Sequence, residues 1–290
     1  MHTRSGDLTN GRSALAGFCA AALAALAAGC VPQVVSEVLT PRDLSPPGVT
    51  AWDSTGPREY VIQFNETVDA NPVDFSADPD LGAVEVFPEG FSLRIAVSAA
   101  AGPGAPISLE GTVRDAADNS TSFVLPFWGY NPDLPRVLFN EILTQGSSTH
   151  PDVVELAVLE PGNLAGLTFR VGCAEFPVLR YIFPSCAAAA GEFIVLHLKP
   201  QGIPAETDET GDTAVSGGLD AYPYARDFWY PGSDGALPGE NGVLTLYASP
   251  TGPLQDALIY SARTSESDTR YGGFGSQALR NQARSVVKEG

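Results

Sequence analysis

The chain has 290 residues and is strongly acidic, with 34 acidic and 16 basic side chains and a formal net charge of −18. Such a surface repels nucleic acid and anionic lipid headgroups, so the charge excludes nucleic-acid binding except through a local patch. Divalent cations and basic partners remain compatible with it. The 30 glycines and 24 prolines, with little helical periodicity after residue 30, favour short strands over helices.

Residues 1–29 have the order of an export signal. A polar segment containing Arg4 and Arg12 precedes an apolar, alanine-rich run that is too short for a comfortable membrane span. Cys30 follows Ala-Ala-Gly, which resembles a bacterial lipobox. The resemblance implies that the thiol is acylated, with palmitate among the acyl chains, and that the mature lipoprotein begins at Cys30 on a membrane. Val31 is not the aspartate that retains lipoproteins at the inner membrane of enteric bacteria, so we expect the outer membrane.

Residues 30–47 carry four prolines and are expected to form an extended tether. From residue 48 to residue 130 the pattern changes to short strands at about ten-residue spacing, separated by turn signals. This spacing leaves no room for helices and predicts a sandwich of two antiparallel sheets. We expect strands at residues 60–64, 82–87, 92–97, 107–113 and 121–125.

Two segments of this first region carry a resemblance to a known family. Ile62–Asp69 is a strand that runs through a phenylalanine into a polar turn, and Gly111–Asn119 ends in an acidic turn. They resemble segments of the bacterial immunoglobulin-like modules of surface proteins. Those modules usually have glycine where this chain has Asp118, so a stiffer turn is expected here.

Residues 129–135 contain two prolines and an asparagine between two strand patterns, which predicts a linker of limited flexibility. A second strand-rich region follows over residues 136–262. We expect its strands at residues 136–143, 152–159, 190–196, 241–247 and 253–260.

Five motifs of this second region occur in the order that is typical of one family: Asn-Glu-Ile at 140–142, Val-Glu-Leu at 154–156, Leu-x-Gly at 164–166, Gly-x-Phe-x-Val-Leu at 191–196, and a closing hairpin at 243–260. The series is similar to the lamin-tail domain, an immunoglobulin-like β-sandwich of exported bacterial proteins. This chain departs from it by lacking a tryptophan beside Val-Glu-Leu, by carrying two cysteines, and by an inserted loop at 201–237.

The expected fold is therefore all-β, with two immunoglobulin-like antiparallel sandwiches in tandem after the signal peptide. Residues 263–290 are polar, and their basic side chains have helical-looking spacing. Two alternatives remain for this end, a short amphipathic helix and a frayed tail, of which we favour the tail.

Two cysteines, Cys173 and Cys186, remain if Cys19 leaves with the signal and Cys30 is acylated. Disulfides persist in exported proteins, so we expect these two to be bridged. Two free thiols are the alternative. The spacing, without accompanying histidines or a second cysteine pair, is poor for zinc.

The inserted loop at 201–237 is longer than most sandwich connections, so it is either functional or loosely ordered. Five aromatic residues fall within nine positions of its second half. They either pack down as a flap over the sandwich, which is the simpler interpretation, or form a contact surface. These residues are Tyr222, Tyr224, Phe228, Trp229 and Tyr230.

Candidates for catalysis are few. The sequence has no Gly-x-Ser-x-Gly elbow, no His-Glu-x-x-His and no phosphate-binding glycine loop. His150 lies in a polar loop, and His197 is predicted to be a strand residue that faces solvent. Glu141 and Glu155 are interpreted as structural rather than as an acid–base pair. We therefore expect no enzyme, and no cofactor beyond the lipid on Cys30.

Calcium is the metal that the sequence could hold. Asp115, Asp118 and Asn119 form an oxygen-rich turn of the kind that calcium uses. The same side chains would equally cap the turn by bonding to its backbone. Neither this turn nor a second acidic cluster matches the EF-hand pattern. The second cluster consists of Glu206, Asp208, Glu209 and Asp212.

These patterns together predict a non-enzymatic envelope lipoprotein that acts as a structural or adhesive module, either binding a partner or serving as a spacer. The loop at 201–237 is the candidate contact, and a protein or another envelope component is the expected partner. The alternatives are an accessory module of an exported hydrolase and a calcium-binding envelope protein.

Overall fold

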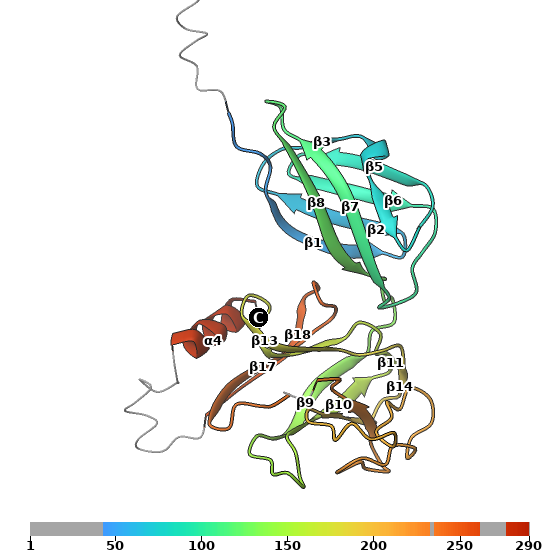
Figure 1. Ribbon diagram of the computed structural model, residues 1–290, viewed down its shortest axis with the longest axis vertical. Coiled ribbons are helices and arrows are strands. Elements are labelled where there is room, and N and C mark those ends of the chain that lie inside the picture. The colour runs from blue at the N-terminus through green and yellow to red at the C-terminus, as the bar shows by residue number, and fades with distance from the viewer. Residues whose placement is uncertain (1–42, 233–234, 262–276, 290) are drawn as a thin grey trace, which may run out of the picture. The chain divides into compact units, whose positions relative to one another are not determined.

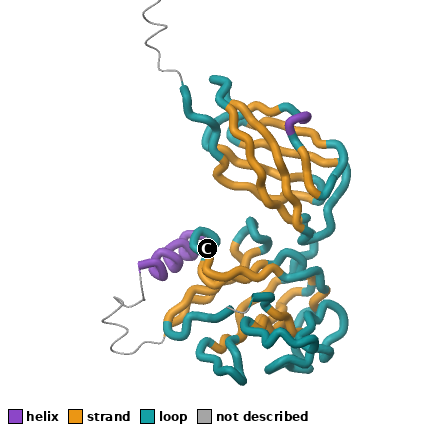
Figure 2. The backbone as a smooth tube through the Cα atoms, viewed as in Figure 1, coloured by secondary structure: helices purple, strands orange, loops and turns teal. Residues whose placement is uncertain are grey.

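The computed structural model describes residues 43–232, 235–261 and 277–289 (Figure 1). The predicted export signal, the lipidation site Cys30 and most of the tether lie outside these residues. Residues 46–290 form one compact unit, separate from residues 1–45. The described part is all-β, as the sequence predicts, and it also contains a single α-helix (Figure 2). Within it, the structure has no helix of the length and apolar character that crossing a membrane requires.

The first sandwich consists of two antiparallel sheets. The strand order of one sheet is β1 (Val49–Gly56), β2 (Glu59–Phe64), β6 (Ser92–Val97) and β5 (Val84–Glu89). In the other, β7 (Pro106–Arg114) pairs with β3 (Asp69–Ala70), β4 (Ser76–Asp78) and β8 (Ser120–Trp128). A 3₁₀ turn, η1 (Pro72–Asp74), separates β3 from β4.

The core of this sandwich follows the two-residue alternation of its strands. Leu93, Ile95 and Val97 of β6 point inward and are buried, whereas their neighbours are only half-buried. Tyr60 and Phe127, from different sheets, meet edge to face with ring centroids 5.2 Å apart. The five strands predicted here are confirmed. They can be predicted because apolar side chains that face the core alternate with polar ones along a strand. Three further strands, β1 and the short β3 and β4, are not predicted from the sequence.

The second sandwich is likewise built from two four-stranded sheets and one small strand pair. One sheet has the order β16 (Arg226–Trp229), β15 (Phe193–His197), β10 (Val153–Glu160) and β9 (Arg136–Leu143). The other has the order β13 (Pro177–Ile182), β12 (Thr168–Gly172), β17 (Asn241–Tyr247) and β18 (Leu254–Ser261). The small pair consists of β11 (Gly162–Asn163) and β14 (Ala187–Ala188).

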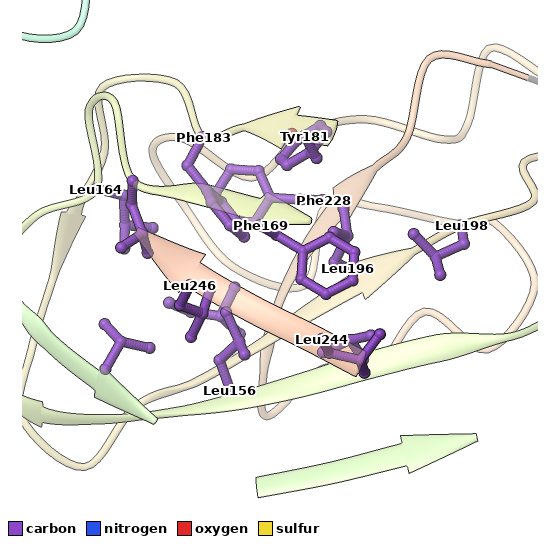
Figure 3. Packing of buried hydrophobic residues seen from close by; sticks show 14 of the residues in the cluster. Leu156, Leu164, Phe169, Tyr181, Phe183, Leu196, Leu198, Phe228, Leu244 and Leu246 are labelled. Atoms are coloured by element: carbon purple, nitrogen blue, oxygen red, sulfur yellow. The ribbon is translucent and has the colours of Figure 1, made fainter. Parts of the chain in front are cut away.

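One pairing in this sandwich differs from the antiparallel prediction, because β16 runs parallel to β15. The core lies between the two sheets, where Leu156 and Phe228 of one sheet pack with Phe169 and Leu244 of the other (Figure 3). The rings of Phe183 and Phe228 meet edge to face, with centroids 5.3 Å apart. The cores of the two sandwiches share no residue.

The edge strand β9 is protected by side chains of β18. The backbone N–H of Val137 donates to Oε1 of Gln255 at 2.9 Å, and that of Phe139 donates to Oδ2 of Asp256 at 2.8 Å. An unpaired strand edge would offer its backbone groups to other chains. These side-chain acceptors therefore satisfy two N–H groups of the edge strand and link it to β18 in the other sheet.

The chain end corrects the prediction of a frayed tail, because α4 (Gln277–Glu289) is a helix docked on the second sandwich beside β17 and β18 (Figure 1). Val286 is 5% exposed and packs with Cys173 and Val243, whereas its neighbour Val287 is 73% exposed. Gln282 is also buried and donates to the carbonyl of Phe176 at 3.3 Å. The amphipathic alternative was the right one.

Candidate functional site

The inserted loop returns to the sheet and becomes part of it. Its strand β16 aligns in parallel with β15, so that Trp229 lies directly opposite His197. Phe228 points into the core, and alternation therefore turns Asp227 and Trp229 to the outer face. There the remainder of the loop covers them, since both are at most 7% exposed.

His197 and Asp227 form a buried pair on this outer face. Nε2 of His197 lies 2.8 Å from Oδ1 of Asp227, and both side chains are 1% exposed. The ring of His197 stacks on that of Trp229, with centroids 4.0 Å apart and planes 12° apart. The prediction that His197 faces solvent was wrong. The side chain does point away from the core, but the inserted loop lies over it.

Three carboxylates, which we call the carboxylate clamp (Asp208, Glu209 and Asp227), hold the loop through its own backbone. Oδ2 of Asp227 accepts the N–H of Tyr222 at 3.0 Å. Glu209 accepts the N–H groups of Val215 and Ser216 at 2.8 and 2.9 Å, and that of Asp227 at 3.0 Å. Because Glu209 is 1% exposed, these hydrogen bonds compensate for its burial.

The third clamp residue, Asp208, ties the loop to both sheets. Its Oδ1 accepts the N–H of Trp229 at 2.8 Å, and its Oδ2 accepts the hydroxyl of Tyr181 at 3.3 Å. Burial and the nearby Asp208 raise the pKa of Tyr181, which keeps the hydroxyl protonated as a donor. Arg226 adds a further link, since Nη1 donates to the carbonyl of Glu209 at 2.6 Å. Two members of the predicted acidic cluster, Asp208 and Glu209, therefore serve to order their own loop.

The five aromatic residues predicted as a contact surface separate into two groups. Phe228 and Trp229 are buried and Tyr230 is half-buried, so a contact role is wrong for the first two and the flap interpretation is confirmed for them. Tyr222 and Tyr224 are 52% and 80% exposed. Their rings lie 5.5 Å apart in an edge-to-face arrangement. The exposed part of the candidate contact is therefore this tyrosine pair.

The predicted disulfide is contradicted, because Cys173 and Cys186 are both buried free thiols. They lie at opposite ends of the β12–β13 hairpin, in which Gly172 pairs with Pro177 near the turn and Thr168 pairs with Ile182 at the open end. From Thr168 to Gly172 the strand rises by four residues, which is about 13 Å. A disulfide needs Cα atoms roughly 4.4–6.8 Å apart, so the fold keeps the two thiols apart.

The turn predicted as a calcium site is capped by its own side chains. Oδ1 of Asp115 accepts the N–H groups of Ala117 and Asn119, each at 2.8 Å. Asp118 has φ of 65°, the left-handed region that favours glycine, and its carboxylate pairs with Arg114 at 2.8 Å. The capping interpretation is confirmed, and calcium binding at Asp115, Asp118 and Asn119 stays a prediction.

The two glutamates weighed as a catalytic pair lie directly opposite each other on neighbouring strands. Glu141 of β9 pairs in register with Glu155 of β10. Nδ2 of Asn140 donates to Oε1 of Glu155 at 2.5 Å. The other histidine of the described chain, His150, is exposed and places Nδ1 2.8 Å from Oδ1 of Asp220.

Comparison with known proteins identifies the second sandwich. The family model described as TP_1001_2nd, protein second domain, matches residues 135–290. The chain belongs to this family. An uncharacterized protein of Treponema pallidum (strain Nichols) is 35% identical over 158 residues, which cover 54% of this chain and 39% of that protein. The match therefore spans less than half of the relative.

Similarity to solved structures is low. The N-terminal part of the bacterial S-layer protein SbsC is 15% identical with a TM-score of 0.28, and the match covers 76% of this chain and 45% of that chain. L,D-transpeptidase 3 from Mycobacterium tuberculosis is 9% identical with a TM-score of 0.20, over 74% of this chain and 98% of that chain. Neither similarity bears on the function.

The family match extends beyond the strands of the second sandwich. It begins at the predicted linker and runs to residue 290, well past the expected end at residue 262. The docking of α4 explains why, because Val286 completes a buried cluster with Cys173 and Val243. The family match therefore covers the helix as well as the second sandwich.

Proposed function

We propose that this chain is a non-enzymatic, lipid-anchored module of the bacterial cell envelope that binds a partner through the exposed tip of the inserted loop. The observation that carries the proposal is the exposed pair Tyr222 and Tyr224 on a loop that the buried clamp holds in place. Tyrosines on an ordered support bind with a small loss of conformational entropy. A protein or another envelope component is the proposed partner.

The buried polar groups of the loop support a binding role over a catalytic one. Asp227 is engaged by His197 and by a backbone N–H, and Glu209 is engaged by three backbone N–H groups. Groups with such partners, shielded from solvent, are not placed to reach a substrate. Their role is to order the loop.

The anchor part of the proposal rests on the first thirty residues. The lipobox-like segment before Cys30 supports acylation, and Val31 supports the outer membrane. Mass spectrometry of the membrane-extracted protein tests this step. An acylated N-terminal peptide from the wild type, absent from a Cys30→Ala variant, is expected. An unmodified Cys30 would overturn the anchor.

The binding part is tested by photo-crosslinking in cells that carry the chain. A benzophenone amino acid replaces Tyr222 or Tyr224 in turn, and Val124, an exposed residue of β8, is the matched control position. We expect one discrete adduct from positions 222 and 224 and none from position 124. Equal labelling at all three positions, or none, would contradict a contact at the tyrosine pair.

Protease treatment of intact cells then places the contact. Cleavage within residues 201–237 before lysis would mean that the tyrosine pair faces the exterior. Protection until lysis would direct the search to components of the periplasm. Both outcomes are compatible with anchoring at the outer membrane, on its outer or inner surface.

A further inference from the structure

A second feature beside the inserted loop is a hollow whose lining does not include Tyr222 or Tyr224. This hollow of about 420 Å³ opens where the β9–β10 loop meets the end of β15. This volume falls within the range of small-molecule sites, roughly 300–1,000 Å³. Its lining includes Ser148, Asp152, Lys199, Gln201 and Leu219.

The wall formed by the β9–β10 loop is fixed by hydrogen bonds between backbone N–H groups and the side chain of Asp152. Oδ1 of Asp152 accepts the N–H of Gly146 at 2.8 Å, and Oδ2 accepts that of Leu237 at 2.8 Å. Gly146 has no space for a side chain, since a Cβ would lie 2.5 Å from the backbone nitrogen of Asp152. These contacts fix the loop that forms this wall of the hollow.

The carboxylates near the hollow are already engaged. Asp152 holds the two backbone N–H groups, and Asp220 accepts from His150 at 2.8 Å. Glu206 accepts the N–H groups of Gln201 and the two residues after it, at 2.6, 2.7 and 3.2 Å. These hydrogen bonds offset part of the negative charge around the hollow.

The ammonium group of Lys199 contrasts with these carboxylates. Within the part of the chain that the structure describes, it has no ion pair and no hydrogen bond, although this chain has twice as many acidic as basic side chains. The chain contains only one other lysine, Lys288 in α4. An unpaired cation beside a hollow, with the hydroxyl of Ser148 and the amide of Gln201 on the same lining, is a donor set for an anion.

We propose that this hollow binds a small organic carboxylate, with the Lys199 ammonium as its counter-ion and with Ser148 and Gln201 as hydrogen-bonding neighbours. Leu219 and the flanking prolines supply apolar wall for the rest of the ligand. The acidity of the whole chain opposes anions, but salt screens charges beyond about 8 Å at physiological ionic strength. A single carboxylate therefore responds mainly to the ammonium group beside it.

A carboxylate of this size could come from a sugar acid or from the end of a short peptide, which offer Lys199 the same group. The probes are therefore glucuronate and acetyl-alanyl-alanine. Glucose and acetyl-alanyl-alanine amide serve as matched neutral controls. Neither the hollow nor the probes involve Tyr222 or Tyr224, so this proposal can fail while the proposed function stands.

The two lysines make a direct measurement possible. The mature chain is labelled with ¹³C at the lysine Cε, and the two resonances are assigned with Lys199→Met and Lys288→Met variants. We expect the Lys199 resonance to shift saturably with one of the carboxylates and not with its neutral control. The Lys288 resonance should stay in place.

Variants then test the donor set. Lys199→Met keeps the aliphatic stem of an exposed side chain, so the fold should be preserved, and affinity should fall about tenfold or more. Lys288→Met should bind as the wild type does. A shift with glucuronate alone assigns a sugar acid, and a shift with the peptide alone assigns a peptide end. Equal shifts of both lysines, or no shift at millimolar ligand, would overturn the proposal.

Discussion

Nε2 of His197 lies 2.8 Å from Oδ1 of Asp227. This hydrogen bond joins the last residue of β15 to β16, and these two strands form the one parallel pair of the described sandwiches. The second oxygen of Asp227 accepts the N–H of Tyr222. A single carboxylate thus connects the sheet to the residue that we propose as part of the contact. Pre-ordering of the tyrosine pair depends on this connection.

Replacing Asp227 with alanine should lower the free energy of unfolding by about 3 kcal/mol, because it leaves a buried histidine nitrogen and the N–H of Tyr222 without their acceptor. Urea unfolding measures the change. Asp220→Asn is the matched control, since it removes the charge of the exposed partner of His150, keeps a residue that tolerates the left-handed backbone there (φ 61°), and should cost less than about 1 kcal/mol. Similar losses in the two variants would argue against a structural role for the buried pair.

Gly218 sits against the indole of Trp229, where an added Cβ would collide with the ring. Gly218→Ala should therefore push the loop away from the tryptophan and cost about 2 kcal/mol. Acrylamide quenching of tryptophan fluorescence should increase. Gly211→Ala provides the control within the same loop, because its Cβ would meet nothing within 4 Å. If quenching is the same in both variants, the loop does not cover Trp229 as described.

The docking of α4 is tested with two neighbouring valines. Val286→Ala should destabilise the second sandwich by about 2 kcal/mol, because Val286 packs with Cys173 and Val243. It should also speed the alkylation of Cys173 in the folded protein. Val287→Ala, at a position 73% exposed, should change neither quantity measurably. A frayed tail would make the two variants indistinguishable.

Because the two cysteines lie apart, both should be present as free thiols that react without prior reduction. Alkylation of the unfolded mature protein without a reductant should add two labels, one each at Cys173 and Cys186. The folded protein should react slowly, because both thiols are buried. Burial also raises the pKa of Cys186, which further lowers its thiolate fraction. Absence of label at both positions in the unfolded protein would indicate a bridge.

Tyr247 gives the second sandwich a pH dependence at its junction with α4. Burial, together with its hydrogen bond to Glu289, raises the pKa of Tyr247 to about 12. Folding therefore favours the protonated hydroxyl. This stabilisation is complete below pH 10, the ordinary pKa of tyrosine, and is lost as the pH rises through about 12.

Urea unfolding between pH 8 and pH 12 should show stability falling in the upper part of this range. Tyr247→Phe should reduce the slope, because it removes one of the tyrosines that titrate. Tyr222→Phe is the control, since its side chain is exposed. A slope unchanged by Tyr247→Phe would show that its hydroxyl does not titrate differently in the folded and unfolded chains.

Strand patterns were readable from the sequence because their cause is local. In β6 and β17 the side chains alone indicate an extended, buried segment, and the observed bounds of both strands equal the predicted ones. The turn at Asp115 was also readable, because its caps lie within four residues along the chain. The polar strand β1 and the short strands β3 and β4 have too few alternating apolar positions to be recognised in the sequence.

The buried pair of His197 and Asp227 could not be predicted from the sequence, for a different reason. Alternation predicted that His197 points away from the core, but alternation specifies a face and not what covers it. The cover comes from residues that are far along the chain, with Asp227 30 positions away from His197. No local pattern marks a parallel edge strand supplied by a loop.

The amino-acid sequence alone predicts the all-β class, and it supplies the polar and apolar residues that are able to form contacts. Tertiary structure alone decided which of these residues meet: His197 with Asp227, and Val286 with Cys173. It also held Cys173 and Cys186 at opposite ends of a hairpin. The physical reason is range, because backbone propensity acts over a few residues, whereas burial and hydrogen-bond satisfaction depend on segments that only folding brings together.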